Sequence, residues 1–321
     1  MKNILITGIG GVVGQGILRN VLDLGLGTKL IGVNVVQVSA GNYMCDRVYT
    51  VPYAYEESYI QAIKDICLKE DIGIIIPSTD YEAFYLAEAQ HEFDCPVAAS
   101  PAVVTKMCLD KFLNFKAFEQ FNIPFAASCL PSEYKGQFKG CVLKPREGRG
   151  SRNIFVNPPQ PAGFDDTYVV QEYLDGPEIT TTFYTKKDGQ LHGFITFVRE
   201  LEQGNTAKAE VTTMYDPELK PLIERMLRHF PFRGSCNIQS RVTDKGIIPF
   251  EINCRISGTN SVRSQFGFKD VAYTVQEYLL NEVPAQPEVV AGTALRVILD
   301  IIYPGMKLSD ITNKEDKFYI R

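Results

Sequence analysis

The chain has 321 residues, of which 45% are hydrophobic and 22% are charged, and a formal net charge of −5 at pH 7. This length predicts two or three domains rather than one core, and the composition is typical of a soluble globular protein. The acidic balance argues against nucleic acid as the main partner, because a phosphate backbone calls for a basic surface. We find no apolar run of the roughly 18 residues that a membrane span needs, so we expect no membrane partner.

The cysteines and histidines do not form a pattern typical of a metal site or of a catalytic pair. The eight cysteines are scattered without a CxxC pair, and only three histidines accompany them. A zinc site or a Cys–His nucleophile is therefore not indicated. Reduced cysteines in a cytoplasmic protein are the simplest interpretation.

The first hundred residues alternate strand and helix signals. Strand-like runs cover 2–8, 29–36, 47–51 and 72–77, and helical periodicity covers 12–24, 56–70 and 80–91. This alternation predicts βαβ units and a doubly wound parallel sheet.

The turn after the first strand is rich in glycine. Gly8, Gly11 and Gly14 give a G-x-x-G-x-x-G spacing between strand and helix, where a dinucleotide could lie on the helix N-terminus. However, the second strand ends at Asn34, where a ribose-binding acid would be expected. We therefore favour a tight turn with close helix–sheet packing, and an NAD(P)-linked oxidoreductase or epimerase is the alternative.

Residues 237–255, NIQSRVTDKGIIPFEINCR, predict a β-hairpin around a three-residue turn at 244–246. A symmetric hairpin places Gln239 opposite Glu251 and Asn237 opposite Asn253, so that four oxygen-bearing side chains share one face. The other face is expected to be apolar and to comprise Ile238, Val242, Ile248, Phe250 and Ile252. An oxygen-lined face suits Mg²⁺, which takes one or two protein ligands beside phosphates and water. A solvated hairpin face is the alternative.

The middle of the chain carries basic and acidic residues next to strands. The strand 140–145 ends near Lys144 and is followed by a loop, REGRGSRN, whose glycines and arginines could cover nucleotide phosphates. An ordinary basic turn is the alternative. Two further strands flank the turn 175–177, with Glu172 before it and Glu178 after it.

The remaining elements alternate helices and strands. We expect two short helices over 101–121, the second beginning near Asp110, where an acid suits the helix dipole. Amphipathic periodicity predicts helices over 216–229 and 270–280, and the apolar run 294–305 predicts a last strand.

Together these segments resemble the ATP-grasp superfamily, and most closely a single-unit protein similar to one half of the carbamoyl-phosphate synthetase large subunit. The resemblance covers nearly the whole chain and includes D-R-V-Y-T-V-P, I-I-I-P-S-T-D, L-D-K, V-L-K-P and Q-E-Y-L. It implies an N-terminal doubly wound pre-ATP-grasp domain over 1–105. An α+β ATP-grasp fold of two subdomains would follow, with a small lid over 106–175 and a large subdomain over 176–321. Only one grasp unit is present, which argues against a complete synthetase.

The resemblance also implies roles for particular residues. Contacts to ATP would come from Lys111, Lys144, Arg146, Gly148, Arg149, Gly150, Ser151, Glu172, Tyr173, Leu174 and Glu178. The Mg²⁺ ligands, with Mn²⁺ as an alternative ion, would be Gln239, Glu251 and Asn253. Arg255 would steady the transferred phosphoryl group, and we expect Arg199 and Arg263 to hold the carboxylate substrate, because an arginine fork binds carboxylates in two-pronged fashion.

The implied activity is an ADP-forming carboxylate–amine ligase, or less often a carboxylate–thiol ligase, that acts through an acyl phosphate. Positioning and charge stabilisation would carry such a phosphoryl transfer, which agrees with the small supply of nucleophiles. The expected partners are small carboxylates and amines, and a homodimer is left open. Besides the oxidoreductase, a non-catalytic nucleotide-binding subunit is an alternative.

Overall fold

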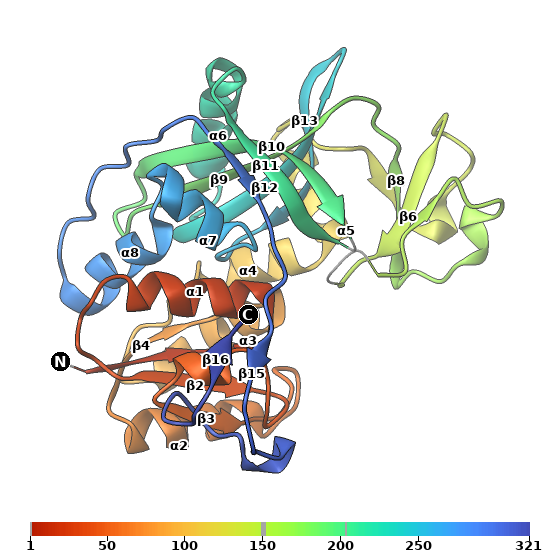
Figure 1. The fold of residues 1–321 in the computed structure, drawn as a ribbon. Coiled ribbons are helices and arrows are strands. Elements are labelled where there is room, and N and C mark those ends of the chain that lie inside the picture. Colours follow the sequence, from red (N-terminus) through yellow and green to blue (C-terminus); the bar gives the residue numbers. More distant parts are fainter. Residues whose placement is uncertain (1, 149–151, 203) are drawn as a thin grey trace.

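The computed structural model describes residues 2–148, 152–202 and 204–321; Arg149, Gly150 and Ser151 of the expected phosphate loop lie outside them. Among the described residues, three sheets of four or more strands organise the fold: a parallel N-terminal sheet, a small antiparallel sheet and a larger antiparallel sheet (Figure 1). The expected fold class, a parallel α/β domain followed by an α+β part with two subdomains, is confirmed. In the described part of the chain, no helix is both long and apolar enough to cross a membrane.

The N-terminal domain is a four-stranded parallel sheet in the order β3-β2-β1-β4. Its order reverses beside β1, so the loops that follow β1 and β4 meet at the carboxyl edge of the sheet, which is where open α/β sheets form binding crevices. The hydroxyl of Thr7, just after β1, accepts from the backbone N–H of Ser78 at 3.1 Å. The elements are β1 (Asn3–Ile6), α1 (Val12–Leu22), β2 (Leu30–Asn34), β3 (Arg47–Thr50), α2 (Tyr59–Lys69), β4 (Ile72–Ile76) and α3 (Asp80–Glu88).

The glycine turn between β1 and α1 owes its composition to packing. Gly8 has a φ of +57°, which favours glycine. A Cβ on Gly14 would lie 2.5 Å from the carbonyl oxygen of Gly8, so only glycine lets the helix approach the strand end this closely.

The small sheet, which we call the lid, is antiparallel in the order β5-β8-β6-β7. It stands apart at one side of the molecule (Figure 1). Its strands are β5 (Ser128–Cys129), β6 (Cys141–Pro145), β7 (Phe155–Val156) and β8 (Tyr168–Glu172).

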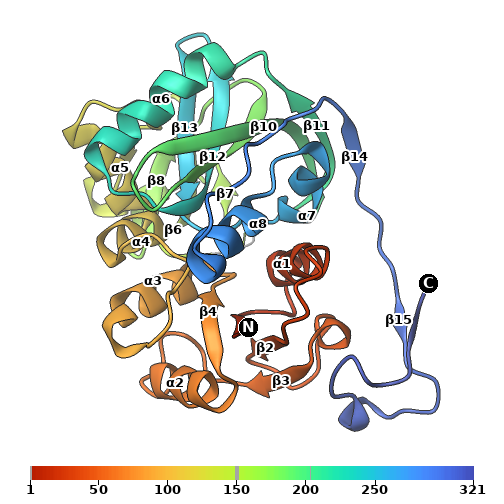
Figure 2. The ribbon, with the colours of Figure 1, turned by 90° about the vertical axis from the view of Figure 1, so that its left-hand side faces the viewer.

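The large subdomain has a six-stranded antiparallel sheet in the order β13-β12-β9-β10-β11-β14. Helix α6 crosses it, and α7 and α8 lie between this sheet and α1 (Figures 1 and 2). The elements are β9 (Glu178–Thr185), β10 (Leu191–Glu202), β11 (Asn205–Thr212), α6 (Asp216–His229), β12 (Gly234–Thr243), β13 (Gly246–Asn253), α7 (Asn260–Arg263), α8 (Asp270–Val275) and β14 (Thr293–Leu295).

The expected boundary between 105 and 106 falls inside a helix, α4 (Ala102–Leu109). Asp110 then caps α5 (Lys111–Gln120) by accepting from the N–H groups of Phe112 and Leu113. Side chains of both helices, including Val104 and Phe118, belong to the same hydrophobic cluster as Phe183 and Ile238 of the large sheet. These helices therefore pack on the large subdomain, and the lid sheet itself begins at β5.

The predicted hairpin is β12–β13, and its two predicted polar pairs are confirmed: Asn237 lies opposite Asn253 and Gln239 opposite Glu251. The turn, however, is shorter than predicted, because Thr243 pairs with Gly246. A register shift next to Gln239 inserts one extra residue on β13 and restores the predicted pairs beyond it. The hairpin therefore contains a bulge at Phe250 that alternation alone does not predict.

Because of the bulge, the apolar face of the hairpin contains other residues than predicted. Ile247, 3% exposed, packs in a cluster with Val242, whereas Ile248 pairs with Arg241 on the opposite side. Phe250 stands at the bulge, and its carbonyl oxygen turns toward the lid. Ile248 and Phe250 were therefore wrongly placed on the core face, because the prediction assumed uninterrupted alternation.

The C-terminal segment leaves the large sheet and reaches the N-terminal domain (Figure 2). The single strand expected over 294–305 is replaced by two short strands, β14 and β15, and Val297 and Ile298 between them are 70% and 95% exposed. Further on, β15 (Ile301–Ile302) pairs with β16 (Tyr319–Ile320). Lys314 anchors this end on the N-terminal domain through a 2.7 Å ion pair with Asp46.

We predict that Gly16→Ala destabilises the protein although alanine favours helices. Its added methyl group would collide with the side chain of Asn260, which is fully buried and bonded to Asn20 at 3.1 Å. Overpacking of this kind costs about 1–3 kcal/mol, more than the gain in helix propensity of about 1 kcal/mol. Urea unfolding of Gly16→Ala, alone and combined with Asn260→Ala, measures this. An equal loss in both backgrounds would contradict the proposed collision.

Candidate functional site

The N-terminal domain, the lid and the large subdomain meet around a cavity of about 370 Å³. Loops after β1 and β4 form one wall, the end of β6 forms another, and the polar face of β12–β13 forms the floor. Polar lining residues are Ser78, Thr79, Asp80, Lys111, Lys144, Arg152, Arg199, Asn205, Thr206, Asn237, Gln239, Glu251, Asn253, Arg255, Ser257, Thr259 and Arg296. The structure thus brings five of the sequence-predicted charged residues into one space: Lys111, Lys144, Arg199, Glu251 and Arg255.

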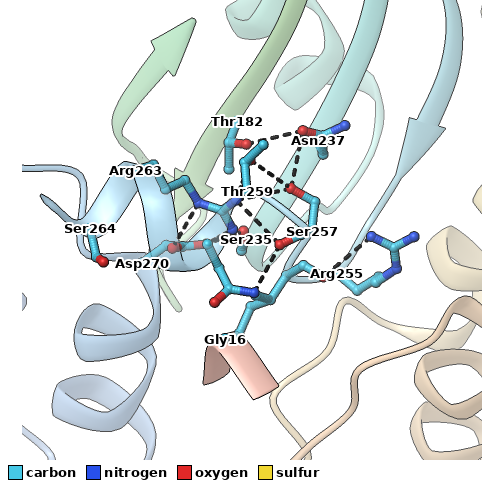
Figure 3. Close-up of polar contacts among 12 residues, drawn as sticks. Gly16, Thr182, Ser235, Asn237, Arg255, Ser257, Thr259, Arg263, Ser264 and Asp270 are labelled. Atoms are coloured by element: carbon cyan, nitrogen blue, oxygen red, sulfur yellow. Dashed lines mark hydrogen bonds and ion pairs between the residues drawn. The ribbon is translucent and has the colours of Figure 1, made fainter. Parts of the chain in front are cut away.

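The polar floor is held in place by hydrogen bonds. The carboxamide oxygen of Asn237 accepts from the hydroxyls of Thr180 at 2.9 Å, Thr182 at 3.1 Å and Ser257 at 3.2 Å, and Figure 3 shows the last two. Asn253 donates to a carboxylate oxygen of Glu251 at 3.2 Å. The amide orientations are therefore set by the protein before any ligand binds.

Lys144 is the most deeply buried cation on the cavity wall, with 3% of its surface exposed. Its ammonium group donates to the side chain of Gln171 at 2.8 Å and to the carbonyl oxygen of Phe250 at 3.1 Å. Burial lowers the pKa of Lys144 to about 8; the charge of Glu251 opposes this shift and that of Lys111 adds to it. An incoming anion would favour the charged amine.

Glu251 is the carboxylate of the floor. Burial by itself would raise its pKa, but the positive charges of Lys111 and Lys144, the hydrogen bond from Asn253 and the charge of Arg255 together outweigh burial and lower the pKa. The group is therefore ionised at neutral pH.

Two arginines line the cavity as members of ion pairs. Arg255 donates to Asp80 at 2.8 Å across the contact between the large subdomain and the N-terminal domain. Arg199 donates to Glu178 at 3.0 Å and to Gln239 at 2.8 Å. Within the described residues, the buried Nε of Arg199 and the buried Oδ1 of Asp80 have no hydrogen-bond partner. Both are polar atoms that a bound ligand could satisfy.

Several predicted nucleotide contacts do not line this cavity. Glu172 accepts from the backbone N–H of Ala127 at 2.7 Å within the lid, and Tyr173 and Leu174 follow it. Glu178 is occupied by Arg199 and Arg241. Their contacts with a nucleotide stay predictions.

Arg146 does not line this cavity, unlike Gly148 and Arg152; it lines a neighbouring pocket that shares these two residues. Its guanidinium binds Asp110 at 2.5 Å, and its carbonyl oxygen accepts from the backbone N–H of Lys111 at 3.0 Å. Arg146 is thus placed to orient α5 and Lys111 from behind.

The position of Arg263 corrects its expected contact with a substrate. It is fully buried and binds Asp270 at 2.5 Å, the Ser257 hydroxyl at 2.9 Å and the Thr259 hydroxyl at 2.8 Å (Figure 3). The sequence could not reveal that an acid seven residues later would capture this arginine. Arg263 instead supports the loop 257–259, whose other side lines the cavity.

A magnesium ion fits the chemistry of the floor. In the part of the chain that the structure describes, no three His, Cys, Asp or Glu side chains group as metal ligands. Mg²⁺ needs fewer, because it commonly takes one or two carboxylates and leaves the other positions to phosphates and water. Glu251 could supply the carboxylate and Asn253 an amide oxygen. The side-chain oxygen of Gln239 accepts from Arg199 in this structure, and its second lone pair could still ligate a metal ion.

Sequence reasoning missed Asp80, Gln171 and Arg296 as site residues. Asp80 had a usable signal, because an acid directly after a buried parallel strand lies at the carboxyl edge of the sheet. Gln171 is part of the Q-E-Y-L motif, but its contact with Lys144 depends on the pairing of two lid strands. Arg296 had no signal, because its contacts join distant segments.

Comparisons with known proteins agree with the fold. Residues 4–98 match the family described as "PylC-like, N-terminal domain", and residues 164–300 match "ATP-grasp in the biosynthetic pathway with Ter operon". A comparison with curated protein sequences gave no significant match.

Solved structures share the fold at low sequence identity. An ADP complex of N5-carboxyaminoimidazole ribonucleotide synthetase is 11% identical with a TM-score of 0.75, over 99% of this chain and 91% of that one. The biotin carboxylase domain of Hydrogenobacter thermophilus 2-oxoglutarate carboxylase, in complex with MgADP, ADP and bicarbonate, is 14% identical with a TM-score of 0.70, over 88% and 70%. An L-amino acid ligase from Bacillus licheniformis is 13% identical with a TM-score of 0.70, over 87% and 74%.

We predict that Arg263→Met acts mainly on stability. It would leave the carboxylate of Asp270, which is 0% exposed, without its cation, and removal of one partner of a buried pair costs about 3–5 kcal/mol. Urea unfolding should show this loss, and Arg263→Met combined with Asp270→Leu should recover part of it. Unchanged stability of the single variant would contradict the structural role.

Proposed function

We propose that this ATP-grasp protein is a magnesium-dependent, ADP-forming ligase that activates a carboxylate with ATP and joins it to an amine or a thiol. The observation that carries the proposal is the convergence of Lys111, Lys144 and Arg255 on the Glu251 floor, in one cavity shared by three parts of the chain. Three cations beside the carboxylates of Glu251 and Asp80 leave an excess of positive charge, which suits a polyphosphate with a metal ion.

In the proposed reaction, a carboxylate oxygen attacks the γ-phosphorus and the bond from that phosphorus to ADP breaks. The amine nitrogen then attacks the acyl carbon, the acyl–phosphate bond breaks, and the nitrogen loses a proton. Bound Mg²⁺ would neutralise phosphate charge and orient the oxygens in line. Lys111 and Lys144 would bind phosphate oxygens, while Arg255 and Arg199, each braced by an acid, would hold the reacting groups without reacting themselves.

The N-terminal glycine turn supports the same site. Gly11, Val12 and Val13 line the cavity that also contains Lys144 and Glu251. This supports a role for the turn in the ligase cavity over a separate dinucleotide site. The carbamoyl-phosphate synthetase-like reaction, Mn²⁺ as a substitute ion and a homodimer stay predictions.

A nucleotide test and a substrate screen examine the proposal directly. MgATP should raise the melting temperature and NAD(P) should not, which separates the ligase from an oxidoreductase. ADP should form when carboxylates and amines are supplied together. ADP formation with no dependence on either substrate would favour a non-catalytic nucleotide-binding protein with background hydrolysis.

We predict that Glu251→Gln removes most ADP formation while the protein stays folded. The change takes away the negative charge among Lys111, Lys144 and Arg255 and the carboxylate of the proposed metal site, which should cost several kcal/mol of transition-state stabilisation, or at least about a hundredfold in rate. EDTA should have a similar effect on the wild type. Glu200→Gln, at an exposed ion pair with Lys208 in the same subdomain, is the matched control. Near-normal turnover of Glu251→Gln would refute the metal assignment.

We further predict that ADP binds more weakly as the pH rises through about 8. The pKa of Lys144 is lowered to about 8, so its amine loses the proton above this pH and with it the attraction for phosphate. The same pKa shift affects stability. Below pH 8 the amine is protonated in both the folded and the unfolded chain, so burying its charge lowers the free energy of unfolding in full. Between pH 8 and about pH 10 only the unfolded chain keeps the proton, and this loss of stability becomes smaller as the pH rises. Calorimetric titrations at several pH values should show that the affinity for ADP falls as the pH rises in the wild type but not in Lys144→Met. An identical pH dependence in both proteins would rule out Lys144 as its source.

A further inference from the structure

Arg296 is a third arginine of the large subdomain on the cavity wall. It directly follows β14, and its backbone N–H donates to the carbonyl oxygen of Ala207 at 2.8 Å. Its guanidinium donates to the carbonyl oxygen of Gly258 at 2.9 Å. These two contacts fix the base and one tip of the side chain beside the loop 257–259.

The charge of Arg296 is not balanced as those of its neighbours are. Arg199 pairs with Glu178 and Arg255 pairs with Asp80, but no carboxylate within the described ranges forms an ion pair with Arg296. Burial lowers the pKa of the Arg296 guanidinium, and the nearby positive charge of Arg19 lowers it further. A guanidinium has five N–H donors, and the contact with Gly258 uses one of them.

The surroundings of Arg296 also separate it from the proposed phosphate-binding cations. Lys144 is held by Gln171 of the lid and by Phe250 at the bulge, whereas Arg296 is held by Gly258 and lies near Arg19 of α1. Arg296 is therefore a separate basic group of the cavity, near α1 of the N-terminal domain, in addition to the cations around Glu251.

We infer that Arg296 binds a second anionic group of the carboxylate substrate, so that the substrate class is an acid with two anionic groups, the distal one a carboxylate or a phosphate. This inference rests on the proposed ligase function and specifies its substrate. One carboxylate is activated beside Arg199 and Arg255, while Arg296 holds the distal anion. An arginine fork is suited to either anion, because its parallel N–H groups match two oxygens.

A binding experiment tests this without turnover. Succinate, glutarate, adipate and 3-phosphoglycerate are titrated calorimetrically into the MgADP-bound protein, with butyrate as the singly charged comparison. We expect at least one of the acids with two anionic groups to bind about tenfold or more tightly than butyrate, and Arg296→Gln to remove this advantage. The dicarboxylates and the phosphorylated acid distinguish the two sources of the distal anion. Arg225→Gln is the matched control, since Arg225 also donates to a single carbonyl oxygen, that of Phe121 at 3.0 Å, outside the cavity wall.

Turnover measurements then distinguish a failure of the inference about Arg296 from a failure of the ligase proposal. We take the acid with two anionic groups that the wild type prefers. Its KM should be about tenfold or more higher in Arg296→Gln than in the wild type, while the KM of butyrate and the affinity for ADP stay nearly unchanged. If butyrate and every acid with two anionic groups support equal ADP formation and Arg296→Gln alters none of the KM values, the inference fails while the ligase stands. If no acid stimulates ADP formation, the ligase proposal fails, and the calorimetric comparison alone decides whether Arg296 binds anions. Equal binding of butyrate and of all four acids with two anionic groups would overturn the inference.

Discussion

The hydrogen bond from Lys144 to the carbonyl oxygen of Phe250 joins the two subdomains that form the candidate nucleotide site. Lys144 lies at the end of a lid strand, and Phe250 lies at the bulge of the large-sheet hairpin. The bulge turns this carbonyl out of the strand ladder, and the backbone oxygen of Pro249 beside it accepts from Ala126 at 2.8 Å. A buried amine is costly unless it is hydrogen-bonded or paired, so the bulge both fixes the position of the charge and keeps it inside the cavity.

Most of the cations discussed above share one feature: each has a hydrogen-bond or ion-pair partner that fixes its position. Cations that face the reacting groups are held by acids or carbonyl oxygens behind them: Arg255 by Asp80, Arg199 by Glu178, and Lys144 by Phe250. Such partners orient a cation before the ligand arrives, which is the condition for electrostatic stabilisation without reorganisation. Arg296 differs from Arg199 and Arg255 because none of the described carboxylates forms an ion pair with it, although its guanidinium donates to the carbonyl oxygen of Gly258. The missing ion pair is the reason to assign it to a ligand.

Much of this site could be predicted from the sequence, because alternation and turn position determine which hairpin residues face each other. Gln239 and Glu251 were paired correctly even though the predicted turn was too long, since the unforeseen bulge compensated for the error. Core assignments on the same strand failed at Ile248 and Phe250, where one inserted residue reverses the faces. Arg263 failed for another reason: a local sequence does not show whether an arginine meets an internal acid or a cavity, and Asp270 decided this through the fold.

The buried network around Arg263 explains how separate domains maintain one cavity. Arg263 holds Ser257 and Thr259, Ser257 donates to Asn237 on the floor, and neighbouring Asn260 bonds to Val13 and Asn20 of α1. The loop 257–259, the floor and the helix after the glycine turn are therefore tied together by satisfied, buried polar contacts, which are costly to break. A substrate held between Arg296 and Arg255 would thus lie in a fixed frame relative to Glu251, and in-line phosphoryl transfer depends on that geometry.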